Sequence, residues 1–155
     1  MNSNQSLVVC LLFACLFGCV SMKGAQPLPI RSLAKGAFSG IKVAQQKVIQ
    51  DAGQWEALWK LHSTSVGAAE KIPAVDFSKE MVIVATMGTR RTGGYSTEIV
   101  RVEPGGKTLS IAVRQSSPPP GAITIQALTA PFHFVAVPRS DLKPEFVEAG
   151  ATDRK

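Results

Sequence analysis

The side chains of this 155-residue chain that could carry chemistry are few and lie far apart in the sequence. Its two histidines are His62 and His133, and its three cysteines, Cys10, Cys15 and Cys19, all precede Val20. Two imidazoles do not supply enough ligands for a metal site, and no serine lies in the sequence context of a hydrolase nucleophile. We therefore predict no catalytic residues, no metal site and no cofactor.

The cysteines belong to a segment with a different chemistry. Residues 7–20 form an apolar run that is short for a membrane span, which needs about 20 residues, and suits a signal peptide. The run ends Leu16-Phe17-Gly18-Cys19, which resembles the lipobox of bacterial lipoproteins. The resemblance implies cleavage before Cys19 and lipidation of its sulfur, and so a membrane-anchored position at the bacterial cell envelope. The alternatives are a cleaved secretory peptide, giving a secreted or periplasmic domain, and an uncleaved anchor.

A second stretch of the sequence has residue types suited to binding a partner rather than to catalysis. Residues 88–95 read Gly-Thr-Arg-Arg-Thr-Gly-Gly-Tyr between two apolar runs. Paired glycines permit close backbone approach, and a tyrosine offers a large surface with a polar tip. The predicted binding residues are Arg91, Thr92, Gly93, Gly94 and Tyr95. The alternatives are a hairpin loop that only reverses the chain, and a Tyr95 that points into the core.

Charge and motifs exclude two classes of partner. The formal net charge is +6, from 17 basic and 11 acidic residues. No dense basic cluster or basic strand studded with aromatic residues is present, so we expect no nucleic-acid binding. The Gly93-Gly94 pair lacks the Gly-Lys-Ser/Thr ending of a phosphate loop, so we expect no nucleotide.

One helix is predicted over about residues 52–62. Asp51 precedes it as a candidate N-cap. Trp55, Leu58, Trp59 and His62 then follow at helical spacing, as one apolar stripe. We expect the two tryptophans to fill the core.

The rest of the domain has strand-like patterns at hairpin spacing. The candidate strands are residues 45–49, 81–87, 95–102, 109–113, 123–130 and 131–137. The run 81–87 is apolar on both faces and is predicted to be central. Pro118-Pro119-Pro120 must lie at an edge or in a loop. The predicted fold class is α+β, a mostly antiparallel sheet or small barrel of about six strands with one amphipathic helix packed on it, and without parallel crossovers.

The expected organisation has four parts. Residues 1–18 are a lipoprotein signal peptide, residues 19–35 a lipidated cysteine with a flexible tether, residues 36–147 the folded domain, and residues 148–155 a disordered tail. The domain itself contains no cysteine and therefore no disulfide or thiolate nucleophile.

Several short blocks, in order, resemble the C-terminal domain of the PrcB protease-complex-subunit family. They include Ser39-Gly-Ile41, Trp55-Glu-Ala-Leu-Trp-Lys-Leu-His62, Val75-Asp-Phe-Ser-Lys-Glu-Met-Val82, Thr92-Gly-Gly-Tyr-Ser-Thr-Glu-Ile99, Pro118-Pro-Pro-Gly121 and Thr129-Ala-Pro-Phe-His133. They span about residues 39–137. The resemblance implies a small secreted or lipid-anchored bacterial domain, and the founding member of the family is an accessory lipoprotein of a cell-surface protease complex.

A weaker resemblance concerns the same turn. Thr92-Gly-Gly-Tyr95 is similar to a loop of chagasin-like cysteine-protease inhibitors. Our first hypothesis is a non-enzymatic, lipid-anchored module that docks a protein partner, such as a protease, through residues 92–95. The alternatives are a chagasin-like inhibitor, an uncharacterised envelope hydrolase that uses His62 or His133, and a purely structural envelope protein.

Overall fold

The computed structural model describes residues 26–65 and 71–149. Within these ranges the chain forms seven strands and one helix. In chain order they are β1 (Arg31–Gly36), β2 (Ala44–Ile49), α1 (Ala52–Ser63), β3 (Glu80–Met87), β4 (Ser96–Gly105), β5 (Thr108–Ser116), β6 (Phe132–Pro138) and β7 (Lys143–Glu148).

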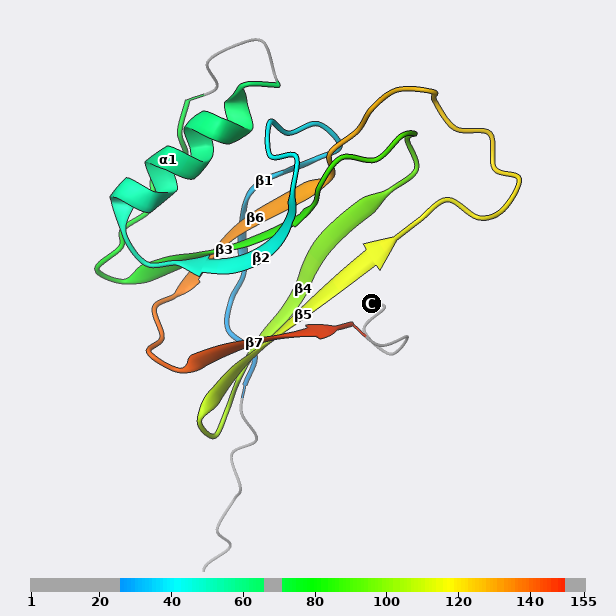
Figure 1. Ribbon diagram of the computed structural model, residues 1–155. Helices are drawn as coiled ribbons and strands as arrows, with labels where there is room; N and C mark the ends of the chain where they lie inside the picture. Colours follow the sequence, from blue (N-terminus) through cyan, green and yellow to red (C-terminus); the bar gives the residue numbers. More distant parts are fainter. Residues whose placement is uncertain (1–25, 66–70, 150–155) are drawn as a thin grey trace, which may run out of the picture.

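The strands form two separate sheets, ordered β1-β6-β3-β2 and β4-β5-β7 (Figure 1). The predicted α+β class is confirmed, whereas the barrel alternative is wrong because the sheets do not close on each other. The edge strands β1 and β4 each carry a register shift, between Ser32 and Ala34 and between Ile99 and Arg101. Such bulges twist an edge and discourage further strand pairing.

Three expectations differ from the structure. Residues 123–130 form a loop with a single bridge at Thr129 instead of a strand. Residues 31–35, expected in the tether, belong to β1 and pair with β6. β5 and β7 pair in parallel, because the chain crosses to the first sheet as β6 before it returns. The spacing of the strands along the sequence does not reveal that β6 belongs to the other sheet. β1 is short and mostly exposed, so its residues do not alternate clearly between buried and exposed.

The first sheet is the middle of three layers. On β3, Val82 and Val84 face α1, whereas Met81, Ile83 and Ala85 face the second sheet. β3 is buried along nearly its whole length, which confirms the predicted central strand. Two hydrophobic cores result, one between the helix and the first sheet and one between the two sheets.

The helix packs as its stripe predicts. Asp51 Oδ1 accepts a hydrogen bond from the Gln54 amide at 2.8 Å, which confirms the N-cap. The buried residues of α1 are Trp55, Leu58, Trp59 and His62. The Trp55 ring lies 5.3 Å from that of Trp59 and 5.8 Å from that of Phe134 on β6, centroid to centroid. Aromatic contacts thus fasten the helix to the sheet.

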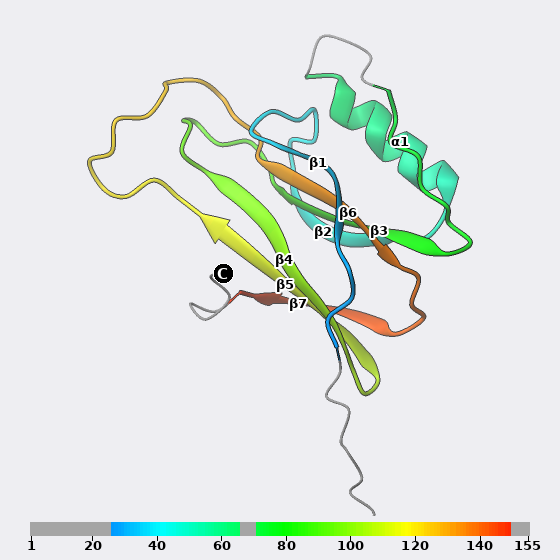
Figure 2. The ribbon, with the colours of Figure 1, turned by 180° about the vertical axis from the view of Figure 1, so that it is seen from behind.

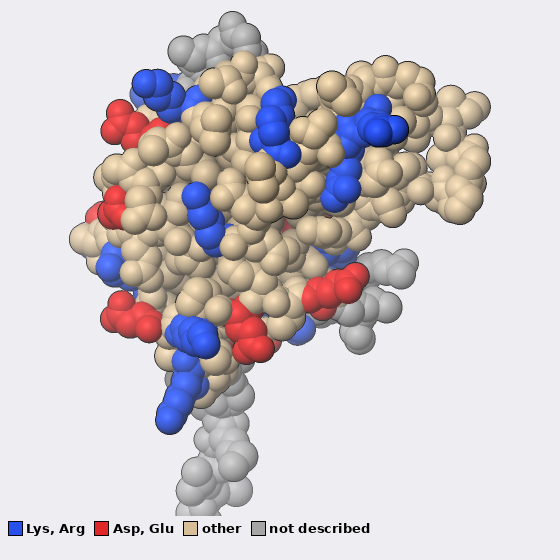
Figure 3. Space-filling view, viewed as in Figure 1, with Lys and Arg blue, Asp and Glu red and all other residues tan. Residues whose placement is uncertain are grey.

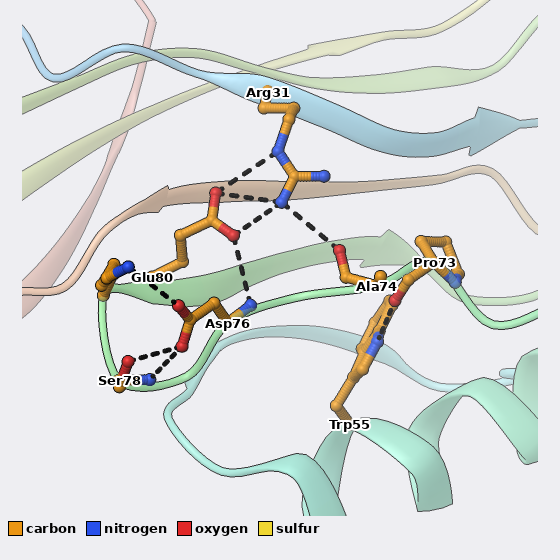
Figure 4. A network of polar contacts seen from close by, with 8 residues as sticks. Arg31, Trp55, Pro73, Ala74, Asp76, Ser78 and Glu80 are labelled. Atoms are coloured by element: carbon orange, nitrogen blue, oxygen red, sulfur yellow. Dashed lines mark hydrogen bonds and ion pairs between the residues drawn. The ribbon is translucent and has the colours of Figure 1, made fainter.

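The segment before β3 joins the helix to β1 (Figure 4). Trp55 Nε1 donates to the Pro73 carbonyl at 3.2 Å, and Arg31 Nη2 lies 2.7 Å from Glu80 Oε2. Asp76 caps the turn by accepting the Ser78 amide at 3.0 Å. Hydrogen bonds from Ser78 hold the pKa of the Asp76 carboxyl below its ordinary value.

Three connecting segments meet at one end of the molecule, and the described chain begins at the other end (Figures 1 and 2). Residues 37–43, 88–95 and 117–131 meet at one end, which we call the loop end. The described chain begins at the opposite end, near the β4–β5 hairpin, and the view from behind agrees (Figures 1 and 2). The amide of Leu28 donates to the Val102 carbonyl at 2.7 Å and fixes the start of the chain there.

Candidate binding surface

The turn 88–95 follows β3 and is built on a close backbone approach. Gly88 has a φ of 68°. A Cβ atom there would lie 2.7 Å from the Ala44 nitrogen, so the position requires glycine. The amide of Thr89 donates to the Lys42 carbonyl at 3.0 Å, which joins the turn to residues 37–43.

The turn is also hydrogen-bonded to the loop 117–131. Arg90 and Thr129 exchange two backbone hydrogen bonds, at 2.7 and 2.9 Å. The amide of Gly93 donates to the Ile125 carbonyl at 3.0 Å, and Thr129 Oγ1 donates to the Thr92 carbonyl at 2.8 Å. Four hydrogen bonds therefore make the turn and the loop one structural unit.

The five predicted binding residues occupy different environments within this unit. Arg91 and Gly94 are exposed, Thr92 and Tyr95 are partly buried, and Gly93 is buried. Tyr95 adopts neither extreme orientation, since its ring lies 5.4 Å below the Arg90 guanidinium carbon. Gly94 has a φ of 86° and lies against Pro118, where an added Cβ atom would come within 2.9 Å of the proline Cβ.

The apolar part of this surface was missed from the sequence. Ile123, Ile125 and Leu128 are exposed, because residues 123–130 form a loop and not a strand. Phe38, in the neighbouring segment, is also exposed. Pro118-Pro119-Pro120 was the available signal, since a chain leaving three prolines cannot readily continue a sheet.

The loop end is basic. Its cations are Lys42, Arg90 and Arg91, and residues 37–43, 88–95 and 117–131 contain no Asp or Glu. Figure 3 shows basic side chains beside the base of the projecting loop, with the nearest acidic side chains lower on this face. The net charge of the protein is therefore concentrated in part at one end, where it favours an acidic partner.

A second cluster of polar residues lies where β1, β4 and β6 meet. His133 Nδ1 accepts the Ile99 amide at 2.9 Å, and its Nε2 lies 3.0 Å from Ser32 Oγ. Burial, together with the charge of Lys35, lowers the pKa of His133 to about 4, against the opposing charge of Glu98. The imidazole is thus neutral at pH 7 and joins both sheets.

The hydrogen bonds of His133 also fix its tautomer. Because Nδ1 accepts an amide proton, the neutral ring carries its own proton on Nε2 and donates it to Ser32. An Nε2 that donates to a hydroxyl cannot remove the proton of that hydroxyl. Ser32 and His133 are therefore not arranged as a nucleophile and base.

Charged groups surround the same place. Lys35 Nζ lies 2.7 Å from Glu98 Oε1, and Arg114 Nη1 lies 3.4 Å from Glu98 Oε2. The hydrogen bond from Lys35 holds the pKa of Glu98 below its ordinary value. An open groove of about 440 Å³ lies over these residues. The ion pairs link β1, β4 and β5 across the groove.

The two histidines do not converge. His62 packs against Phe132 and Phe134, with ring centroids 4.3 and 5.2 Å away, on the helix side of β6. His133, between these phenylalanines in β6, points to the opposite side, toward β4. One site that uses both imidazoles is incompatible with this alternation.

Two further features concern the described ranges only. Residues 26–65 and 71–149 hold no group of three or more His, Cys, Asp and Glu side chains placed to bind a metal ion. Nor does this part of the chain contain a helix of the length and apolarity needed to cross a membrane. The predicted lipidation site, Cys19, lies outside the described residues.

Comparison with known proteins identifies one family. The family model described as PrcB C-terminal matches residues 81–138, which run from β3 through β6 and include the turn 88–95 and the loop 117–131. No curated protein and no solved structure matches the chain. The blocks before residue 81 lie outside the matched range. Over residues 81–138 this match confirms the resemblance to the PrcB C-terminal family that the sequence predicts.

Proposed function

We propose that this protein is a lipid-anchored accessory module of the bacterial cell envelope that docks a protein partner, a protease complex, through the turn 88–95. The match to the PrcB C-terminal family supports the role of protease-complex subunit. The lipobox-like sequence that ends at Cys19 supports the anchor.

The observation that carries the docking role is the way the turn is held. Four hydrogen bonds join it to the loop 117–131, yet Arg91 and Gly94 remain exposed at its surface. A preorganised loop loses little conformational entropy when it binds. A turn that only reversed the chain would need no such support from a second loop.

Photo-cross-linking tests this role. A photoreactive amino acid replaces Arg91 in the full chain, and a matched variant carries it at Lys107, an exposed residue of the β4–β5 hairpin at the opposite end. After irradiation of envelope membranes, we expect a discrete protein adduct from position 91 and none from position 107. Equal adducts from both positions, or none from position 91, would contradict docking through the turn.

The anchor is tested separately. We expect Cys19→Ser to abolish incorporation of labelled palmitate and to release the domain from membranes, whereas Cys15→Ser leaves both unchanged. A Cys19→Ser chain that still takes up the label and sediments with membranes would show that the lipobox assignment is wrong.

A second candidate function is direct inhibition of a cysteine protease, as the chagasin-like turn suggests. The contact of Gly94 with Pro118 favours it, because it puts the proline loop beside the turn as a second element that could enter a cleft. Steady-state assays with a papain-like protease decide it. Loss of inhibition in Gly94→Ala is expected if the turn enters the cleft, and no inhibition by the unaltered chain rejects this candidate.

A further inference from the structure

The loop end exposes aliphatic side chains that a folded domain ordinarily buries. Ile123, Ile125 and Leu128 are 104%, 60% and 69% exposed, respectively. Leu128 also lines a hollow of about 200 Å³ together with Phe38. Exposed apolar side chains that gather in one place and are rimmed by polar groups mark an interaction site.

Two cations, Arg90 and Arg91, lie beside these side chains. Within the described ranges neither forms an ion pair, and Arg90 Nε is buried without a hydrogen-bond partner. The Arg90 guanidinium carbon lies over the Tyr95 ring, 5.4 Å from its centroid. The N–H donors of a guanidinium lie along its edge, where they match the two oxygens of a carboxylate. Arg90 is partly exposed and Arg91 is exposed, so both side chains are within reach of a carboxylate of a partner.

The cationic and apolar groups are adjacent. The antiparallel bridge pairs Arg90 with Thr129, the residue that follows Leu128, and the hydrogen bond from Gly93 to Ile125 brings the turn against the same loop. Lys42 lines the hollow with Phe38 and Leu128. A ligand that covers this surface therefore meets positive charge and apolar surface within a few residues of its length.

The position of the loop end separates a protein from a lipid surface as its partner. The described chain begins at the other end of the molecule, so a domain tethered through its N-terminal segment has the loop end at its far side (Figures 1 and 2). A basic, apolar loop meant for lipid insertion would lie on the side from which the anchor leaves. The geometry favours a protein.

We infer that the loop end recognises a segment of the partner protein in which an Asp or Glu lies next to aliphatic or aromatic side chains. The carboxylate pairs with Arg90 and Arg91, and the apolar side chains pack on Ile125 and Leu128. This inference rests on the proposed function, because it names the chemistry of the partner that the turn docks.

A displayed library of random linear peptides, selected against the full chain, tests the inference. We expect enrichment of sequences that combine Asp or Glu with neighbouring Leu, Ile or Phe. With Arg90→Gln and Arg91→Gln together, the preference for acidic positions should disappear. With Ile125→Ser and Leu128→Ser together, the preference for apolar positions should disappear, and Lys107→Gln, at the opposite end, should change neither.

Two further measurements accompany the peptide selection, one of peptide affinity and one of vesicle binding. The strongest selected peptide is titrated against the chain at low and high salt, and we expect at least a tenfold weaker affinity for the Arg90→Gln/Arg91→Gln variant at low salt. Anionic phosphatidylglycerol vesicles are offered to the Cys19→Ser chain, and we expect no binding. Absence of enrichment, enrichment of neutral or basic peptides, equal affinity of the variant, or vesicle binding lost in Ile125→Ser/Leu128→Ser would each overturn the inference.

Failure here is distinguishable from failure of the docking role. A protein adduct from position 91 in envelope membranes, without acidic and apolar enrichment, rejects the partner chemistry and leaves docking through the turn standing. Absence of that adduct rejects docking through the turn itself.

Discussion

The helix-facing core and the loop end use aromatic and apolar residues in opposite ways. In the core, Trp55 and Phe134 are at most 2% exposed and contact each other edge to face. At the loop end, Ile123 and Leu128 extend into solvent, while Tyr95 lies half covered by Arg90. The core side chains stabilise the fold through burial, whereas those of the loop end leave apolar area available for a partner. Removal of an aromatic or apolar side chain is therefore expected to lower stability in the core and to lower partner affinity at the loop end.

The largest expected effect is in the core. Trp55→Ala removes a ring that packs on Trp59 and Phe134 and donates a hydrogen bond to the Pro73 carbonyl. Truncation of a buried tryptophan costs about 3–5 kcal/mol of unfolding free energy, which denaturant titration measures. Leu61→Ala, on the exposed side of the same helix, is the matched control and should change stability little. Similar losses in both variants would contradict the assignment of the buried face.

The next effect concerns the polar contact between the sheets. The pKa of His133 is about 4 in the folded protein against an ordinary value of 6.5. Between these two pH values the unfolded chain takes up a proton that the folded protein does not, so stability falls as the pH is lowered from 6.5 to 4. At about 1.36 kcal/mol per pKa unit the loss is about 3 kcal/mol. Unfolding titrations across this pH range measure it.

His133→Gln is the control for that titration. The amide oxygen of glutamine can accept the hydrogen bond from Ile99, but the side chain does not titrate. The variant should lose the part of the pH dependence that belongs to His133, and subtraction of its curve from that of the unaltered protein isolates this part. Identical slopes for both proteins between pH 4 and 6.5 would show that His133 is not responsible.

At the loop end we expect a substitution to reduce partner binding more than it reduces stability. Tyr95→Ala should weaken partner capture by about 2 kcal/mol or more, as at interface hot spots, and lower stability less than Trp55→Ala does. Pull-down titration and thermal unfolding measure the two effects. Tyr95→Phe keeps the ring beneath Arg90 and should retain most of the affinity. A Tyr95→Ala protein as unstable as Trp55→Ala, yet with unchanged binding, would place Tyr95 with the core.

The smallest expected effect is the difference between alanine substitutions at two glycines. Gly94 and Gly106 have φ values of 86° and 61°, and alanine in such a conformation costs about 1–2 kcal/mol. An added Cβ atom meets Pro118 at Gly94 but open space at Gly106. Gly94→Ala should therefore be the less stable variant and the only one of the two that weakens partner capture. Equal binding by both would show that the packing of the turn on the proline loop is irrelevant to docking.

Local patterns in the sequence predicted the elements that are decided locally. The N-cap at Asp51 and the stripe from Trp55 to His62 depend on residues within a few positions of one another, and both are confirmed. The apolar run 81–87 likewise indicated a central strand, since a strand with two apolar faces must be covered on both.

The candidate surface was predicted only in part for the same reason. The glycines and Tyr95 of the turn are visible in the sequence, but the hydrogen bonds that support them come from Ile125 and Thr129, more than thirty positions away. Residues 123–130 have the pattern of a strand in the sequence. Only the fold shows that Ile123, Ile125 and Leu128 are exposed in a loop, since strand β6 begins after them.

The helix, most of the strands, the mostly antiparallel α+β class and the resemblance of residues 81–138 to the PrcB C-terminal family could all be predicted from the sequence. Periodicity and turn chemistry act over short distances and can therefore be read along the chain. The tertiary structure alone decided that the sheets stay separate, that β7 pairs in parallel with β5, and that His133 faces away from His62. These features depend on which distant segments meet, and contacts between distant segments leave no local pattern in the sequence.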